Sequence, residues 1–347
     1  MRTLDFDYHL PSELIAQNPA EPRDGSRLLV LNRTNGRLEH RVFRDLPEHL
    51  RPGDLLVANR SRVIPARLMG VKESMGSAVE MLLLRPTAGA GDVGVWDVLL
   101  KPARRLKPGT KVTFGQGELV AMVLSSNELG VRTVRLESSE PLDRVVDRLG
   151  HAPLPPYITQ YSGDPERYQT VYAETRGSAA APTAGLHFTP ELMDRIREMG
   201  VGISFVTLHI GIDTFRPVQE EDPTEHPMHR EYYEVPEEAA REITMAKREG
   251  RRVIAVGTTT VRVLESAATQ GNPASMVAGS GWTQLFIYPG YRFNVVDALV
   301  TNFHIPRSTL VMLVSALAGR ERLLTAYREA VEQGYRFYSF GDAMLVV

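Results

Sequence analysis

Imidazole side chains are the groups in this sequence best suited to proton transfer, because the pKa of histidine lies close to neutral pH. Five of the nine histidines lie in turn-like segments beside small or polar residues. His209 ends the apolar run VTLHIG, His304 lies in TNFHIPRSTL, and His226 and His229 lie in the proline-broken stretch EHPMHREYY. A single histidine of this kind is more often structural than catalytic, but the group together indicates acid–base chemistry.

The fifth of these histidines, His187, follows a run of small side chains in SAAAPTAGLHFT, residues 178–189. A helix packed in a core would carry Leu, Ile or Phe at these positions. The Ala, Gly, Thr and Pro residues instead favour a close approach of the backbone to something that is not protein.

A possible anion site follows the strand-like run RRVIAV, where a glycine turn leads into a helix that begins with Thr258, Thr259 and Thr260. The N-terminus of a helix presents free N–H groups and a partial positive charge, which suit a carboxylate or a phosphate. Threonine is also a common N-cap, so the alternative is that these hydroxyls serve only their own helix.

Metal chemistry is disfavoured by the sequence. The chain has no cysteine, which excludes disulfides, a thiolate nucleophile and Cys-ligated zinc or iron–sulfur clusters. His226 and His229 are three residues apart but lack the HExxH pattern. Catalysis is therefore expected to use His, carboxylates, hydroxyls, Arg or Lys, without a metal.

The formal net charge of −2 gives no overall attraction to nucleic acid, so a polyanion would have to bind a local basic patch. Two stretches qualify, and for the second of them a solvated surface is the alternative. NRSRVIPAR contains Arg60, Arg62 and Arg67, and KPARRLKPGTK contains Lys101, Arg104, Arg105, Lys107 and Lys111.

With 347 residues the chain exceeds the size at which one hydrophobic core keeps growing, so two domains are expected. Residues 66–150 contain short strand-like runs separated by glycine turns, which predict an inserted small antiparallel β-barrel domain. In residues 1–65 and 151–347, strands alternate with amphipathic helices. This alternation predicts an α/β main domain, a mixed sheet with flanking helices.

Local signals add three expectations. LPSELIAQ predicts a helix that is capped by Ser12 and ended by Pro19, and Asn35-Gly36 between two alternating runs predicts a β-hairpin. The chain shows no signal segment and no apolar run near the roughly 20 residues that span a bilayer. A cytoplasmic location without a membrane partner is therefore expected.

Long motifs in this sequence resemble those of the S-adenosylmethionine:tRNA ribosyltransferase-isomerase family. They are PLPPYI, RYQTVYA, AAPTAGLHFT, PGYRF, TNFHIPRSTL and YSFGDAM, and they run almost from end to end of the chain. One departure is Asp213, where the family usually carries glycine. The resemblance implies transfer and isomerisation of the ribosyl group of S-adenosylmethionine onto 7-aminomethyl-7-deazaguanine at the tRNA wobble position. The products would be epoxyqueuosine, adenine and methionine, so S-adenosylmethionine is consumed as a co-substrate.

The resemblance also implies roles for residues. A base would remove a C5′ proton beside the sulfonium, and without an iron–sulfur cluster this route is polar. The candidate bases, in order, are His187, His209, His229 and His304. The expected substrate contacts are Thr183, Gly185, Phe188 and Asn302, with Thr258, Thr259 and Thr260 for the methionine carboxylate and Tyr157 or Phe188 for base stacking. The expected contacts with the tRNA anticodon stem-loop are Arg60, Arg62, Lys101, Arg104, Arg105 and Lys107.

The enzyme is expected to be a monomer. Two other functions stay open from the residues alone. One is a non-catalytic tRNA-binding protein in which the basic insertion matters and the histidines are structural. The other is a nucleotide or sugar-phosphate transferase that uses the threonine-rich helix start without RNA.

Overall fold

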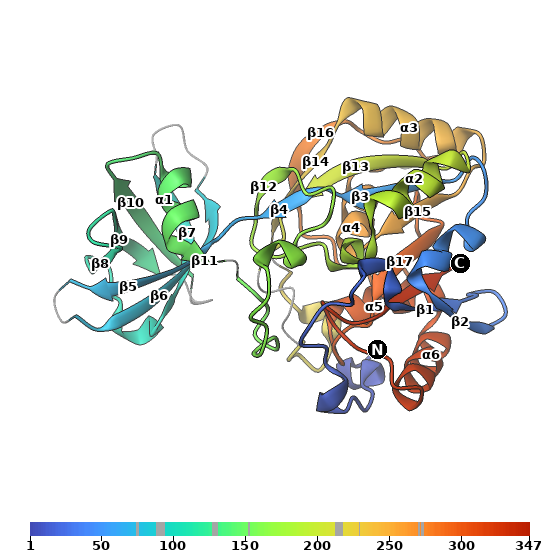
Figure 1. Cartoon of the computed structure of the whole chain (residues 1–347), viewed down its shortest axis with the longest axis horizontal. Helices are drawn as coiled ribbons and strands as arrows, with labels where there is room; N and C mark the ends of the chain where they lie inside the picture. Colours follow the sequence, from blue (N-terminus) through green and yellow to red (C-terminus); the bar gives the residue numbers. More distant parts are fainter. Residues whose placement is uncertain are drawn as a thin grey trace. The chain divides into compact units, whose positions relative to one another are not determined.

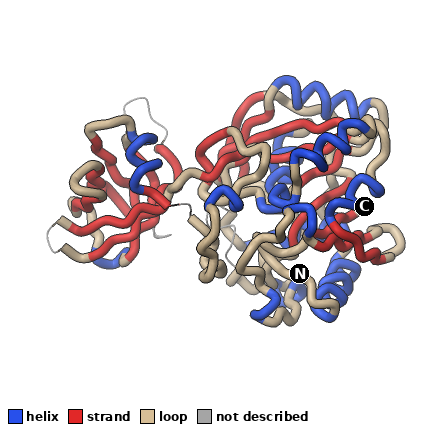
Figure 2. The backbone as a smooth tube through the Cα atoms, in the orientation of Figure 1, coloured by secondary structure: helices blue, strands red, loops and turns tan. Residues whose placement is uncertain are grey.

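The computed structural model describes residues 1–73, 76–87, 94–126, 131–151, 153–211, 218–228, 230–269, 271 and 274–347 (Figures 1 and 2). The chain forms two compact units. The first comprises Met1–Ser61, Pro155–Thr175 and Ala181–Val347, and the second comprises Arg62–Leu154 and Arg176–Ala180. The second unit contains the whole of the expected insertion, residues 66–150. That this segment is a domain of its own stays a prediction.

A nine-stranded mixed sheet forms the centre of the first unit. In spatial order the strands are β16 (Gly279–Thr283), β14 (Glu231–Val235), β13 (Gly202–Leu208), β3 (Leu55–Asn59), β15 (Val253–Val256), β17 (Ala298–Asn302), β18 (Ala343–Val346), β1 (Arg27–Leu31) and β2 (Leu38–Val42). Strands β13, β3, β15 and β17 are parallel neighbours, whereas β14 and β18 run antiparallel to their neighbours β13 and β17.

Helices follow the strands as the sequence periodicity predicts, and the expected mixed α/β architecture is confirmed (Figure 1). Every residue of β3, β15 and β17 is buried, which requires cover on both faces of the sheet. One face packs against α2 and the 3₁₀ helix η4 (Phe43–His49) through Leu192, Ile196 and Leu46. The α-helices of this unit are α2 (Pro190–Glu198), α3 (Glu237–Arg248), α4 (Thr258–Ala267), α5 (Thr309–Ala318) and α6 (Arg320–Glu332).

The second unit contains a closed antiparallel barrel, as expected. Its strands are β5 (Arg67–Lys72), β6 (Ala78–Pro86), β7 (Val95–Lys101), β10 (Arg132–Ser138), β9 (Leu119–Ser126) and β8 (Lys111–Phe114), and β8 pairs with β5 to close the ring. A Cβ on Gly70 would lie 2.6 Å from the Phe114 ring, so β5 needs glycine where it meets β8. The sequence patterns did not predict β5 or the helix α1 (Leu142–Leu149).

The remaining elements are short. β11 (Gly150–His151) adds to the barrel sheet beside β5, and β4 (Ser61–Val63) pairs with β12 (Thr175–Ser178) in a two-stranded sheet. The other 3₁₀ helices are η1 (Thr3–Phe6), η2 (Ser12–Leu14), η3 (Arg23–Gly25), η5 (Ala103–Arg105), η6 (Pro165–Tyr168), η7 (Thr183–His187) and η9 (Pro223–Glu225).

The two local predictions near the N-terminus have opposite outcomes. The hairpin at Asn35-Gly36 is confirmed, because β1 pairs antiparallel with β2 and Gly36 adopts a φ of 77°. The predicted helix in LPSELIAQ is wrong, since only the single turn η2 forms. Ala16 donates its N–H to the Phe337 carbonyl at 3.2 Å and Phe337 donates to Leu14 at 2.8 Å, so long-range pairing holds this segment extended.

In the part of the chain that the structure describes, no helix is both long enough and apolar enough to cross a membrane.

Candidate functional site

A cavity opens where three parallel strands of the large sheet end. β15 leads through Gly257 into α4, β17 ends at Asn302, and β13 ends two residues before Ile210. The carboxyl ends of parallel strands are where ligands bind in open α/β sheets. The walls, all from the first unit, are residues 181–184, 257–259 and 301–305, together with Tyr157, Ile210, Leu310, Tyr338 and Ser339.

The cavity is small. Its volume is about 50 Å³, whereas pockets for drug-sized ligands usually have about 300–1,000 Å³. A nucleoside would therefore extend beyond this space or require its walls to move.

His187, the first-ranked histidine, lies behind the cavity wall in the core. It is 4% exposed, and its ring packs against Phe43 with the ring centroids 4.9 Å apart. Burial is the main reason that its pKa falls to about 3, and the cations of Arg336 and Arg23 lower it further. His187 is therefore neutral at physiological pH, and the residues lining the cavity do not include it.

Hydrogen bonds connect His187 to the cavity through Asn302. The Asn302 Nδ2 group donates to His187 Nε2 at 3.1 Å, so the ring proton lies on Nδ1 and points to Ser26 Oγ, 2.8 Å away. Asn302 Oδ1 accepts a hydrogen bond of 2.8 Å from Thr183 Oγ1. Asn302 and Thr183 both line the cavity, so His187 fixes the orientation of the amide that the cavity presents.

Among the candidate histidines that the structure describes, His304 lines the cavity itself. Its Nε2 lies 2.7 Å from Thr301 Oγ1, and its backbone is held by Tyr327, which accepts from the His304 N–H at 3.1 Å. Burial lowers the pKa of His304 to about 3. Within the described part of the chain, its Nδ1 has no hydrogen-bond partner. The arrangement can accept a proton or a hydrogen bond at Nδ1.

His209 lies one residue from the cavity wall. Its ring stacks on Tyr232, with centroids 5.7 Å apart, and burial lowers its pKa. Its Nδ1 is buried without a hydrogen-bond partner among the described residues. The candidate His229 lies outside the described residues, as does Asp213, where the family usually carries glycine. The nearby His226 pairs with Glu220, with Nδ1 and Oε2 2.8 Å apart.

The threonines at the start of α4 divide into two groups. Thr258 and Thr259 line the cavity, whereas Thr260 Oγ1 donates to the Val256 carbonyl at 2.7 Å and serves its own helix. Gly257, which precedes them, adopts a φ of 91° that side-chain-bearing residues rarely tolerate. The cavity therefore receives the N-terminal turn of a ten-residue helix and two hydroxyl groups.

The small residues before His187 contact protein as well as the cavity. Ala181 and Ala184 line the cavity, but a Cβ on Gly185 would lie 2.1 Å from the Tyr172 hydroxyl. Phe188 is 3% exposed and belongs to the core beneath the sheet. The structure therefore gives a packing reason for Gly185 and Phe188, neither of which is among the cavity-lining residues.

Two tyrosines complete the wall. The ring of Tyr157 lies 4.7 Å from that of Tyr338, and the Tyr157 hydroxyl contacts Ser339 Oγ at 2.7 Å. Tyr338 has a φ of 71°, an unusual conformation for a non-glycine residue that often marks functional sites. Tyr338 and Thr301 were not among the site residues expected from the sequence, although the motif YSFGDAM contains the first and TNFHIPRSTL begins with the second.

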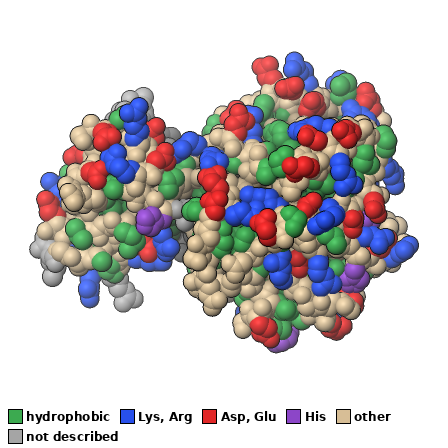
Figure 3. Space-filling view, viewed as in Figure 1, with side chains coloured by type: hydrophobic (Ala, Val, Ile, Leu, Met, Phe, Trp, Pro, Cys, Tyr) green, Lys and Arg blue, Asp and Glu red, His purple; other side chains and the backbone are tan. Residues whose placement is uncertain are grey.

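The expected tRNA-binding cations lie in both units. Figure 3 shows cationic and anionic side chains interspersed over the viewed face. In the first unit Arg60 pairs with Glu174 at 3.1 Å. In the second unit Arg62 is partly buried, Lys101 lies 3.8 Å from Glu80, and Arg105 and Lys107 are exposed; the Arg104 side chain is not described.

No group of three or more His, Asp or Glu side chains that could hold a metal ion occurs among the described residues.

Comparisons with known proteins agree with the motifs. A family model described as "Queuosine biosynthesis protein" matches residues 3–346. The chain is 56% identical to the S-adenosylmethionine:tRNA ribosyltransferase-isomerase of Symbiobacterium thermophilum, covering 100% of both chains. It is 57% identical to the protein of that name from Heliobacterium modesticaldum, covering 99% of this chain and 98% of the relative.

A solved structure is also similar. It is the S-adenosylmethionine tRNA ribosyltransferase of Thermotoga maritima, which matches with a TM-score of 0.56 and 42% identity over 99% of this chain and 100% of that chain. Together these similarities confirm the family resemblance that the sequence motifs indicated.

Proposed function

Because the chain belongs to the queuosine biosynthesis protein family, we propose that it is an enzyme that transfers and isomerises the ribosyl group of S-adenosylmethionine onto tRNA. The acceptor is 7-aminomethyl-7-deazaguanine at the wobble position, and the products are epoxyqueuosine, adenine and methionine. The observation that carries this proposal is 56% identity, over the whole of both chains, to a relative named for this reaction.

His304 is our choice for the base that removes a C5′ proton. The positive sulfonium makes the neighbouring C–H bonds acidic, and the base must be uncharged before it can accept a proton. Burial keeps His304 neutral, with a pKa of about 3, and its ring lines the cavity. The low pKa makes the imidazole a weak base but keeps it unprotonated beside a cation. For His209 and His229 the role of base stays a prediction.

The rest of the cavity is assigned to binding. Thr258 and Thr259 at the N-terminus of α4 suit the methionine carboxylate, since a helix start attracts negative charge. Thr183 and Asn302 offer a hydroxyl and an amide to the nucleoside, and His187 holds Asn302 in place. Tyr157 and Tyr338 offer ring faces for stacking a base.

The experiment that tests the proposed function measures product release. The protein is incubated with S-adenosylmethionine and tRNA that carries the aminomethyl base, and adenine and methionine are quantified by mass spectrometry. We expect both products in equal amounts, and none with tRNA that lacks the aminomethyl group. Tight tRNA binding without release would support a non-catalytic tRNA-binding protein. Turnover of free nucleotides without tRNA would support a nucleotide transferase.

Exposed cations of the second unit are proposed to contact the tRNA backbone. Lys107→Ala should weaken tRNA binding and reduce the slope of log K against log salt by about 1, because one phosphate contact releases about one counterion. The KM for S-adenosylmethionine should not change. Binding is measured by filter retention at several salt concentrations.

Arg248→Ala is the matched control for Lys107→Ala. It removes one exposed cation from α3, in the other unit, and changes the net charge by the same amount. If both substitutions change the salt slope equally, the effect comes from net charge and the assignment of Lys107 is wrong.

The proposal includes a monomeric enzyme that acts in the cytoplasm, where tRNA is modified.

A further inference from the structure

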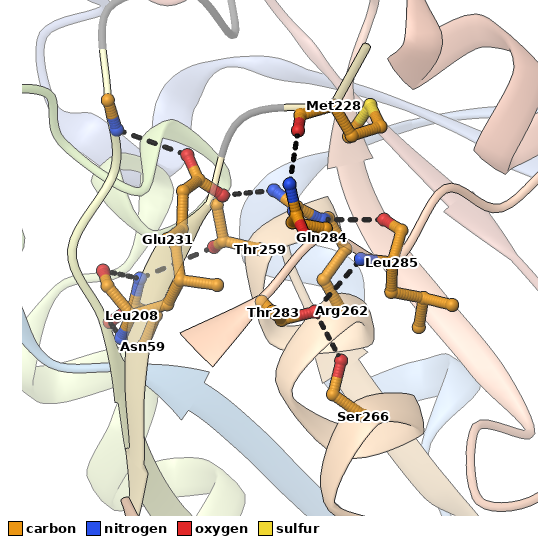
Figure 4. A network of polar contacts seen from close by, with 11 residues as sticks. Asn59, Leu208, Met228, Glu231, Thr259, Arg262, Ser266, Thr283, Gln284 and Leu285 are labelled. Atoms are coloured by element: carbon orange, nitrogen blue, oxygen red, sulfur yellow. Dashed lines mark hydrogen bonds and ion pairs between the residues drawn. The ribbon is translucent and has the colours of Figure 1, made fainter. Parts of the chain in front are cut away.

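A buried ion pair joins α4 to the first residue of β14. Arg262 Nη1 donates to Glu231 Oε2, and each residue is only 5% exposed (Figure 4). Arg262 Nη2 is buried without a hydrogen-bond partner among the described residues. In that part of the chain Glu231 is the one carboxylate that pairs with Arg262. A buried guanidinium depends strongly on its counterion, because an unpaired charge is costly in the interior.

The position of Arg262 is fixed from a second side. Its Nε donates to the Leu285 carbonyl at 3.1 Å. The Leu285 N–H in turn donates to Thr283 Oγ1 at 3.1 Å, and Thr283 Oγ1 contacts Ser266 Oγ of α4 at 2.6 Å (Figure 4). The guanidinium therefore has a defined orientation, in which Nη1 faces the Glu231 carboxylate.

The other oxygen of Glu231 holds the backbone at the cavity wall. Glu231 Oε1 accepts the Gly211 N–H at 3.1 Å, and the His209 N–H donates to the Tyr232 carbonyl at 2.9 Å. These two bonds attach the turn after β13 to the start of β14. Ile210, which lies between His209 and Gly211, lines the cavity.

Asn59 is a second residue that connects the end of β13 to α4. Its side chain forms hydrogen bonds of 3.1 Å and 3.0 Å with the backbone N–H and carbonyl of Leu208. Asn59 Nδ2 also lies 3.4 Å from Thr259 Oγ1, on the first turn of α4 (Figure 4). The end of β13 is therefore joined to α4 at two places, directly at Thr259 on the first turn and, through Glu231, at Arg262 on the second.

From this network we infer that Glu231 and Arg262 are positioning residues for the reaction. Neither residue is among those that line the cavity. It sets the position of Gly211, and hence of Ile210, relative to Thr258 and Thr259 on the opposite wall. This inference rests on the proposed function, in which these two walls receive S-adenosylmethionine.

The test compares two double variants that both remove the buried charges. Arg262→Met with Glu231→Gln keeps a side-chain oxygen for the Gly211 N–H, whereas Arg262→Met with Glu231→Met removes it. Replacing a buried ion pair with apolar residues is often neutral for stability, so we expect both proteins to fold with similar Tm. The KM for S-adenosylmethionine should be roughly 10–100-fold higher in the Met/Met variant than in the Gln variant, because small misplacements near a reacting centre are costly. The KM for tRNA should be the same in both.

The matched control is another ion pair that holds a backbone N–H. Lys247 pairs with Asp297 at 2.8 Å, and Asp297 also accepts the Val253 N–H at 2.8 Å, at the opposite end of β15 from the cavity. Two double variants should leave the KM for S-adenosylmethionine unchanged. One combines Lys247→Met with Asp297→Asn, and the other combines Lys247→Met with Asp297→Leu.

Equal KM values in the two Glu231 variants would overturn the inference, and so would a loss of activity that only follows a loss of Tm. An inactive wild-type protein would instead refute the proposed function. In that case calorimetric titration with S-adenosylmethionine still compares the two variants, and equal affinities would overturn the positioning role.

Discussion

Replacing His304 with glutamine is expected to lower kcat by ~10²–10⁴ while the protein stays folded. His304 lines the cavity and its ring is neutral; in the tautomer that donates from Nε2 to Thr301, Nδ1 is an acceptor. Glutamine can keep the contact with Thr301 Oγ1, 2.7 Å from the imidazole in the native protein, but it cannot act as a base. The measurement is adenine release at saturating S-adenosylmethionine and tRNA, together with the KM of each substrate. Since the lost interaction belongs to the transition state, kcat should fall more than either KM changes.

Two variants accompany this experiment. His9→Gln makes the same substitution at an exposed histidine and should leave kcat unchanged. His187→Gln tests the order of candidates that the sequence favoured. If His187 only orients Asn302, its loss should act mainly on the KM for S-adenosylmethionine. A large fall in kcat for His187→Gln, with no change for His304→Gln, would return the role of base to His187.

The motif around His187 contains residues that line the cavity, but His187 itself lies behind them and contacts Asn302. Residues 181–184 of this motif line the cavity, Thr183 among them. The partners that bury the imidazole are Ser26 and Asn302, which are 161 and 115 residues away along the chain. No local pattern contains such contacts. Whether a histidine faces a cavity or lies one layer behind it depends on packing that only the folded chain defines.

The fold was predictable where local chemistry and long-range packing agree. Asn35-Gly36 can adopt the tight turn that a hairpin needs, and apolar runs such as RVIAV must be buried in any compact fold. The segment LPSELIAQ shows the opposite case. Its cap and spacing favour a helix, but pairing of Leu14 and Ala16 with Phe337 keeps it extended. Strand β5 was missed because Gly70 interrupts its apolar pattern, although closing the barrel requires that glycine.

Lowering the pH from 7.5 to 5.0 is expected to destabilise the first unit. Burial lowers the pKa of His187 and of His304 from the usual 6.5 to about 3. Between these values the unfolded chain binds protons that the folded chain does not, so stability is present above pH 6.5 and is lost as the pH falls toward 3. At pH 5.0 the loss is about 2 kcal/mol for His187. The pKa of His304 is lowered to the same value, so the loss that it contributes is similar.

Urea unfolding at the two pH values measures this loss. Trp282 belongs to the first unit and Trp96 to the second, so a Trp96→Phe background lets fluorescence follow the unit that holds both histidines. At pH 5.0 most carboxylates are still ionised, which limits their share of the change. In a His187→Gln variant the difference in unfolding free energy between pH 7.5 and 5.0 should shrink by about 2 kcal/mol. His151→Gln, at an exposed position in β11, should not alter it. An unchanged pH dependence in His187→Gln would mean that the imidazole titrates in the folded protein as it does in water. The assignment of His187 as a buried, neutral residue that orients Asn302 would then be wrong.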